Sequence, residues 1–429
     1  MRRLFFTGSF FLLSSVSLAQ TGESIIDEIK EINKTVTSQH SGTVISNRAM
    51  NVFMADKTGY LSAGDDLSFY TNYVTFNSMD GIFTVNHNFQ KPNGIDEPLK
   101  TLFSVGFKAN VNSIGATFLD KQFDDELALT MNYKWLCKIK THADKSQQKF
   151  MNALRAAAAQ TLEIAIEKEI ADFKTALNKI DTADVSGQNM DTAKALMQQN
   201  FYEEIKEKYV TLFSSRQAEL LTKTNNFKLI TFGYTSFTVT VPLVFPTYTV
   251  APSFTASFAK KHSYPLQIML QHTRLWESSK LGRLFLTLGA NLLFSNSKLS
   301  YGVDKINIST YKNMGGADTL HLAENNKAYL GLYQTFFTPS LKARIVYYPT
   351  GSHIGISLMA AQNIGIDKLF NVRLGVPIVL INSKKVPAAA VECYVSFFDI
   401  NHTVKNTEGR GKRIALGLSV GIPFSRLMY

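Results

Sequence analysis

The chain has 429 residues and a formal net charge of +11, with 18% charged and 12% aromatic residues. Cysteine occurs only at Cys137 and Cys393, which excludes a disulfide scaffold and a cysteine-based zinc site. The basic residues do not gather into a patch interleaved with aromatic residues, so the charge does not indicate nucleic-acid binding. After the N-terminus, no apolar run approaches the roughly 20 residues that a transmembrane helix needs.

The N-terminus has the layout of a secretory signal peptide. Arg2 and Arg3 supply the positive start, a mostly apolar run follows, and residues 17–19 (SLA) have the small-x-small form of a cleavage site. We therefore expect residues 1–19 to be removed and the mature chain to begin at Gln20. The alternative is an uncleaved anchor, for which the apolar run is short, since a membrane span takes roughly 20 residues.

Residues 20–65 form a separate N-terminal segment. Ile25, Ile29 and Ile32 recur at helical spacing and predict a short amphipathic helix over residues 23–36. The rest of the segment is rich in glycine and polar residues, which predicts loops. Two placements stay open for it: a plug inside a barrel, or a tail in the periplasm.

Most of the chain from residue 66 to residue 429 alternates between large and small side chains. In IALGLSVGIPF (414–424), every second residue is a large hydrophobe, and those between are alanine, glycine, serine or proline. This alternation predicts a β-strand, because successive side chains point to opposite faces. The pattern suits a strand between lipid and a barrel interior, or one enclosed in a soluble sandwich. The strand lengths favour the membrane, since a tilted transmembrane strand needs roughly 9–11 residues.

The predicted fold is an all-β transmembrane antiparallel barrel with an inserted α-helical hairpin. We predict fourteen strands, with twelve as the alternative, because 81–90 and 297–310 carry the weakest pattern. An even number puts both chain ends on the periplasmic side. That places the turns after the sixth, eighth, tenth and twelfth strands (KKHS, N, PTG and INSKKV) in the periplasm. The predicted strands are 66–76, 81–90, 99–111, 125–139, 227–242, 247–260, 264–276, 282–295, 297–310, 328–349, 353–363, 370–381, 387–400 and 411–424.

Residues 143–222 interrupt the strand pattern. Leu162, Ile166 and Ile170 recur at helical spacing, and a second helical run follows a polar break. Two amphipathic helices joined by a short loop predict an antiparallel hairpin that buries both apolar stripes. Its place between the fourth and fifth strands puts it on the periplasmic side. There it projects toward a protein partner, folds back as a plug, or has no partner at all.

Positive charge dominates the strand face that the alternation turns toward the lumen. Fixed positive charge in a water-filled lumen concentrates anions and suits a pore that selects them. The alternatives are an ion-pair network across the lumen and, for charges at the outer rim, contact with lipopolysaccharide phosphates. The predicted lumen-lining charges are Lys108, Lys134, Arg283, Lys342, Arg344, Arg373 and Arg413, with Glu392 as the acid.

The sequence gives little support for catalysis. It contains no HExxH metalloprotease motif, and its histidines are scattered singly. We therefore expect no enzymatic activity, no cofactor and no metal. A serine–histidine–acid site assembled from separate strands is the enzymatic alternative, because such sites are defined by geometry rather than by spacing.

The signal peptide, the alternating strands of membrane length and the final Tyr429 resemble a Gram-negative outer-membrane β-barrel protein. Such proteins end on an aromatic residue that serves assembly; Leu427 fits the alternation counted from that end, and Ser425 departs from it. The SLAQ signal end and the DTA tripeptides at 181–183 and 191–193 resemble exported, O-glycosylated proteins of the Bacteroidetes. The resemblance implies the outer membrane as location, with its lipid and lipopolysaccharide as partners.

These observations predict an outer-membrane channel for small polar or anionic solutes. The alternative is a barrel scaffold whose helical hairpin docks a protein partner, without transport. Whether the lumen is open or filled distinguishes the two functions. Filling of the lumen by residues 20–65, together with Phe285, Tyr394 and Phe398, would favour the docking alternative. No nucleic-acid partner is expected.

Overall fold

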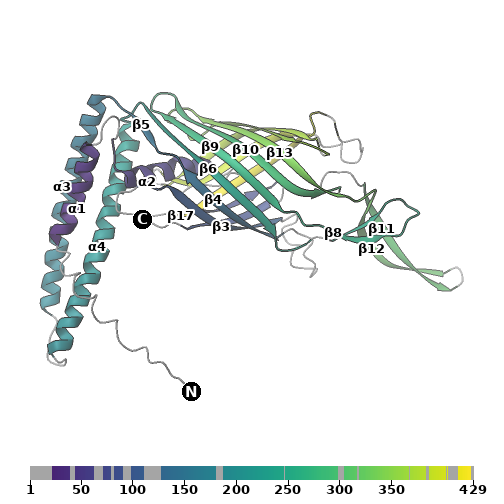
Figure 1. Ribbon diagram of the computed structural model, residues 1–429, viewed down its shortest axis with the longest axis horizontal. Helices are drawn as coiled ribbons and strands as arrows, with labels where there is room; N and C mark the ends of the chain where they lie inside the picture. The colour runs from purple at the N-terminus through teal and green to yellow at the C-terminus, as the bar shows by residue number, and fades with distance from the viewer. Residues whose placement is uncertain are drawn as a thin grey trace, which may run out of the picture.

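The computed structural model shows a closed antiparallel β-barrel with a helical module at one end and a small separate sheet at the other (Figure 1). We call these the helix-side end and the far end. The residues that the structure describes are 22–38, 44–61, 71–78, 82–89, 98–110, 127–179, 187–245, 247–297, 304–315, 318–366, 368–382, 386–401, 403 and 414–426.

The barrel closes through its own strand pairing. The first strand pairs with the last, and β4 pairs with β6 across the point where the helical module is inserted. Thirteen strands among the described residues share this sheet; the short β5 (Lys140–His142) lies beyond the end of β4 along β6, so twelve form the wall. These twelve are β1 (Thr71–Asn77), β2 (Ile82–Phe89), β3 (Thr101–Asn110), β4 (Leu127–Leu136), β6 (Leu229–Pro242), β9 (Gln267–Ser278), β10 (Gly282–Asn296), β13 (Thr335–Tyr348), β14 (Ile356–Asn363), β15 (Phe370–Ile381), β16 (Pro387–Phe397) and β17 (Ile414–Arg426).

The twelve-strand alternative is therefore confirmed, and the count of fourteen is wrong. The predicted strands 247–260 and 297–310 do not form wall. Their residues contribute to a four-stranded sheet at the far end, in the order β11-β12-β7-β8 (Figure 1). β8 consists of one alanine, two lysines and a histidine, all exposed, so this stretch has no large apolar face to turn toward lipid. The strands of this sheet are β7 (Thr247–Ala251), β8 (Ala259–His262), β11 (Asp304–Gly315) and β12 (Asp318–Leu330).

The number of wall strands also decides at which end of the barrel two of the predicted turns lie. Because 247–260 is not wall, β9 runs in the direction opposite to the predicted one. KKHS (260–263) and Asn296 accordingly lie at the far end, whereas Ser279–Leu281 makes a turn at the helix-side end. After β11 and β12 the observed strand direction agrees with the predicted one again, and the turn at 349–351 lies at the helix-side end as expected.

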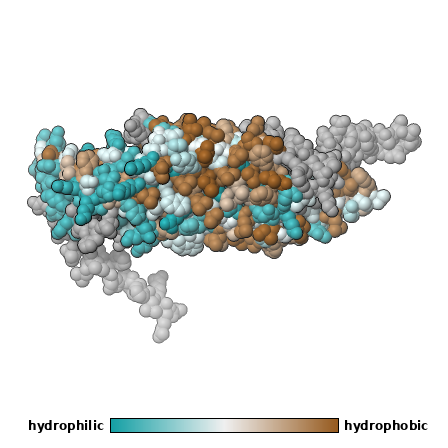
Figure 2. Space-filling model, turned by 90° about the horizontal axis from the view of Figure 1, so that it is seen from above, coloured by the Kyte–Doolittle hydropathy of each residue, from teal (hydrophilic) through white to brown (hydrophobic). Residues whose placement is uncertain are grey.

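The outward face of the wall is apolar. Along β10, Leu284 and Leu288 are 37% and 52% exposed, while Phe285 and Thr287 between them are 1% and 3% exposed. Figure 2 shows hydrophobic residues gathered over the wall and hydrophilic residues over the helix-side end. A soluble protein rarely exposes so extended an apolar surface, so this band is suited to contact with lipid.

The helical module is a three-helix bundle that runs roughly crosswise to the barrel (Figure 1). It consists of α1 (Gly22–Ser38), α3 (Lys145–Asn178) and α4 (Gly187–Thr224). The bundle core joins Ile25 and Ile29 of α1 to Ile166 of α3 and to Ile205 and Phe213 of α4, all buried. Among the described residues, none of the helices combines the length and the apolar character that crossing a membrane requires.

Candidate functional site

A helical plug fills the helix-side mouth of the barrel. It comprises Val44–Leu61, with α2 (Asn47–Thr58) followed by the short 3-10 helix η1 (Gly59–Leu61). Ser46 caps α2, since its hydroxyl accepts a hydrogen bond from the Ala49 amide at 3.2 Å. Phe53 is fully buried in one apolar cluster with plug residues and inward-facing wall residues. The wall side of this cluster includes Tyr234, Leu275, Phe285, Val346 and Tyr348.

Tyr60 is the plug residue with the most specific contacts to the wall. Its ring lies edge-on to Tyr348, with ring centres 5.0 Å apart, and its carbonyl accepts a hydrogen bond from the Tyr348 hydroxyl at 3.0 Å. Its hydroxyl is 3.0 Å from Nδ1 of His353. The guanidinium of Arg283 sits 3.8 Å from the centre of its ring. Aromatic, polar and cationic contacts thus hold η1 in one position.

An ion cluster lies beneath these rings. Arg283 and Glu277 form a two-pronged pair, with Nε–Oε2 at 2.5 Å and Nη2–Oε1 at 3.1 Å. Lys57 of the plug approaches Oε1 of Glu277 at 3.6 Å. All three residues are buried, so the plug contributes a cation to a charge cluster in the wall.

The plug is also tied to the helical module. Arg155 of α3, fully buried, donates to the Val44 carbonyl at 2.8 Å and to Asn33 of α1 at 3.1 Å. Gln217 of α4 accepts from the Ser46 amide at 3.0 Å. A displacement of α3 or α4 would therefore be transmitted to the start of the plug.

A second buried network lies among the wall strands. Arg344 pairs with Glu392 at 2.7 Å, and the Ser357 hydroxyl donates to the same carboxylate. The guanidinium of Arg373 lies 4.1 Å from the centre of the Tyr394 ring. The Tyr394 hydroxyl in turn donates to Asn77 at 2.6 Å. This part of the lumen is therefore bridged by polar side chains.

The predicted lumen charges divide into three groups. Lys134, Arg283, Arg344 and Glu392 are buried, while Lys108, Lys342 and Arg373 are half-buried. Arg413 lies outside the described residues. Lys108 lines a cavity of about 310 Å³ at the far end, together with Thr240, Gln267, Asn291 and Thr338.

Three residues at the contact between the plug and the wall were missed from sequence. Glu277 lies one step past the predicted strand 264–276, although Gln271, Thr273 and Leu275 already mark the inward face. Extending the alternation by that step would have added it to the predicted set. Lys57 and Tyr60 lie in a stretch without strand alternation, and only their place in the predicted plug segment pointed to them.

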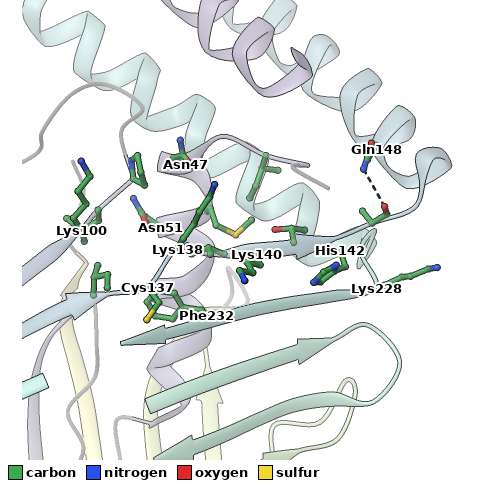
Figure 3. A pocket seen from close by; sticks show the side chains of 18 of the residues that line it. Asn47, Asn51, Lys100, Cys137, Lys138, Lys140, His142, Gln148, Lys228 and Phe232 are labelled. Carbon is green, nitrogen blue, oxygen red and sulfur yellow. Dashed lines mark hydrogen bonds between the residues drawn. The ribbon is translucent and has the colours of Figure 1, made fainter. Parts of the chain in front are cut away.

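A basic pocket opens beside the plug at the helix-side end (Figure 3). Its volume is about 1260 Å³. Its walls come from α2, the segment before β3, the stretch from the end of β4 through β5 to the start of α3, and β6. The basic side chains that line it are Lys100, Lys138, Lys140, His142 and Lys228.

A serine motif in the wall lacks the setting of a hydrolase nucleophile. Residues 417–421 read GLSVG and match GxSxG in letters. A nucleophile elbow places the serine at a sharp strand-to-helix turn, where its hydroxyl is exposed. Ser419 instead lies within β17, is 4% exposed and stands opposite Glu392 in the strand register. Across the described ranges, no cluster of three or more histidine, cysteine, aspartate or glutamate side chains is suited to hold a metal ion.

Comparisons with known proteins identify no family. No family model matches the chain, and no curated protein matches it. The likeness to solved structures is weak, as two of the matches show. The toluene transporter TbuX of Ralstonia pickettii is 8% identical over 80% of this chain and 68% of its own, with a TM-score of 0.23. OmpT, an outer membrane protein of Vibrio cholerae, is 6% identical over 82% of this chain and 94% of its own, with a TM-score of 0.19. The barrel is established by its strand pairing rather than by these likenesses.

Two titratable groups make the plug sensitive to pH. Burial lowers the pKa of Lys57 to about 8, with Arg283 acting in the same direction and Glu277 against it. Burial also lowers the pKa of His353 below its ordinary value of 6.5, and Arg283 and Lys57 add to this. Both groups therefore bind protons more weakly when the plug is seated than when it is free.

Acidification is expected to loosen the plug. The lowered pKa of His353 means that the seated state loses stability as the pH falls below 6.5, whereas Lys57 stays protonated throughout that window. A nitroxide on Asn47→Cys, in a Cys137→Ser/Cys393→Ser background, should gain mobility between about pH 7.5 and pH 5. His353→Gln should abolish that change; a pH response that survives it would contradict the assignment to His353.

Proposed function

We propose that the chain is an outer-membrane protein whose barrel anchors a helical module at the periplasmic face and is closed there by the plug. One observation carries this proposal: Phe53 and Tyr60 are buried in the mouth while Arg155 and Gln217 tie the plug to α3 and α4. The apolar outward band supports a membrane location, with outer-membrane lipid and lipopolysaccharide around it.

The helical module is proposed to dock a protein partner. It carries large apolar side chains that neither the bundle core nor the barrel covers, and exposed apolar groups outside a membrane favour protein contacts. A partner bound to α3 or α4 also has a direct route to the plug through Arg155 and Gln217. The exposed apolar residues of α3 and α4 are Phe150, Ile164, Leu196, Met197 and Leu212.

Site-specific photo-crosslinking in the native cells tests the docking proposal. A photoreactive residue at Ile164, 64% exposed, or at Leu196, 59% exposed, is expected to give one discrete protein adduct. The matched control is Phe254, which is 76% exposed but lies between β7 and β8 at the far end. Absence of an adduct at both helical positions, or the same adduct from Phe254, would contradict docking by the helices.

A channel for small polar or anionic solutes is the second candidate. It is favoured by the far-end cavity, which Lys108 lines together with uncharged polar residues. Permeation then requires the plug to leave the mouth, because Phe53 and Tyr60 occupy it in the described state. Planar-bilayer conductance of the full chain and of a variant without the plug tests this candidate.

A further inference from the structure

The basic pocket combines a large volume with three lysines for which the described residues provide no salt-bridge partner. Lys100, Lys138 and Lys140 are exposed, and within the described residues none of them forms a salt bridge. The acid on the lining, Asp144, is already engaged by Lys228 at 2.8 Å. The pocket therefore carries a net positive charge that its own side chains do not neutralise, which favours an anionic ligand.

A strand irregularity places two of these lysines on the pocket wall. Leu136 is paired with Tyr234 and Lys140 with Thr231, so four residue steps on one strand face three on the other. Such a bulge adds one residue and redirects the side chains next to it. Without this extra residue, the side chains would continue to alternate between the two faces of the strand past Leu136. The bulge thus redirects side chains at the pocket and leaves the pairing of β4 with β6 before Leu136 regular.

Amides and an apolar floor complete the lining. Figure 3 shows Lys138 extending from the strand side toward α2, where Asn47 and Asn51 lie, with Lys100 at the left of the same opening. Leu99, which is buried, and Phe232, 2% exposed, give the pocket an apolar base. A ligand with a compact anionic head and an apolar portion would complement both parts of this lining.

The pocket also lies close to the lipid-facing surface of the wall. Trp135, 47% exposed, points outward two residues before Cys137, which lines the pocket. Tryptophan side chains favour the boundary between lipid and water. The headgroup layer of the periplasmic leaflet would therefore reach the level of the pocket, if the barrel spans a membrane as proposed.

We propose that the basic pocket binds a phosphate-bearing anion through Lys100, Lys138 and Lys140. Lysine ammonium groups bind phosphate as point charges and need no fixed fork geometry. Two sources supply this chemistry: the headgroup of an anionic phospholipid and free phosphate. The apolar base formed by Leu99 and Phe232 favours the lipid.

Calorimetric titration of the full-length protein in neutral detergent tests the proposal and separates the sources. One arm uses a short-chain phosphatidylglycerol, a second uses inorganic phosphate, and a third uses short-chain phosphatidylcholine, whose headgroup is neutral overall. Saturable binding of phosphatidylglycerol but not phosphatidylcholine is expected, and it should weaken with added salt because exposed charges are screened. The Lys100→Gln/Lys138→Gln/Lys140→Gln variant should bind at least tenfold more weakly.

A matched variant controls for the loss of charge. Lys168, Lys174 and Lys179 are exposed on α3 or just after it and do not line the pocket, so their replacement by glutamine removes the same charge elsewhere. Its affinity should equal that of the wild type. Saturable binding of inorganic phosphate, lost in the pocket variant alone, would support the proposal with free phosphate as the source. No binding in either anionic arm, or equal weakening in both variants, would overturn it. Because these arms do not depend on a partner protein, failure of the docking proposal would leave them unaffected.

Discussion

Removal of residues 44–61 is expected to turn a non-conducting barrel into an ion-conducting one in planar bilayers. The plug fills the mouth with the side chains of Phe53, Met54, Tyr60 and Leu61, each buried. Burying a large apolar side chain contributes roughly 1.5–3 kcal/mol, so spontaneous release of the intact plug is rare. The full chain should therefore show only infrequent openings, while the deletion variant should conduct continuously.

A single substitution tests the same barrier in a chain of full length. Lys57→Glu sets a carboxylate beside Glu277, 3.6 Å from the present ammonium. Breaking a buried ion pair costs about 3–5 kcal/mol. Since each 1.4 kcal/mol changes a population about tenfold, the open fraction should rise at least roughly a hundredfold.

The control reproduces the change in charge without the buried contact. Lys34→Glu on the exposed side of α1 alters net charge equally and should leave conductance unchanged. Steady conductance of the wild type would argue against the closed barrel. A deletion variant that does not conduct would instead exclude the channel function and leave a barrel that anchors the helical module.

In a conducting variant, Lys108→Glu should move the reversal potential toward cations, because Lys108 lines the far-end cavity.

The wall could be predicted from sequence because its rule is local. Successive side chains of a strand point to opposite faces, so the alternation alone assigns Leu288 to lipid and Thr287 to the interior. The exposures of these two residues, 52% and 3%, agree with that assignment. The predicted strand 282–295 differs from β10 (Gly282–Asn296) by a single residue at one end. The twelve-strand alternative was right in number, but it placed the doubt on 81–90, which forms β2, and not on 247–260, which leaves the wall.

The contacts across the lumen could not be predicted in this way. Alternation turns Arg344 and Glu392 inward, but their meeting depends on the order of strands around the ring and on the register of three pairings. The plug contacts of Lys57 and Tyr60 depend on the path of a segment without periodicity. Pro252 follows β7, and Gly331, with a φ of 135°, separates β12 from β13; both positions interrupt predicted strands.

Loss of the Arg344–Glu392 pair is expected to cause a large drop in barrel stability. Arg344 is 7% exposed and Glu392 is 3% exposed, so neither charge can turn to water when its partner is removed. Glu392→Ala leaves a buried guanidinium without this carboxylate, and the Ser357 hydroxyl loses its acceptor. The expected decrease in the free energy of unfolding is about 3–5 kcal/mol. Urea unfolding of the lipid-reconstituted protein, followed by tryptophan fluorescence, measures it.

Two further variants separate charge from packing at this site. Arg344→Met/Glu392→Leu removes both charges and should recover most of the loss, because apolar residues of similar volume replace a buried pair at little cost. Glu207→Ala on the exposed face of α4 is the control for removal of a glutamate and should stay within about 0.5 kcal/mol of the wild type.

A substitution at Gly375 tests whether the pair fixes the position of the Glu392 carboxylate. In the wild type, a Cβ at Gly375 would approach Oε1 of Glu392 and Oγ of Ser357 to 2.5 Å each. Gly375→Ala should therefore destabilise the wild type more than the double variant. In the wild type, Arg344 and Ser357 hold the carboxylate in place. The shorter leucine side chain of Glu392→Leu leaves room for the added methyl group. Equal costs in the two backgrounds would show that the pair does not fix the position of the carboxylate.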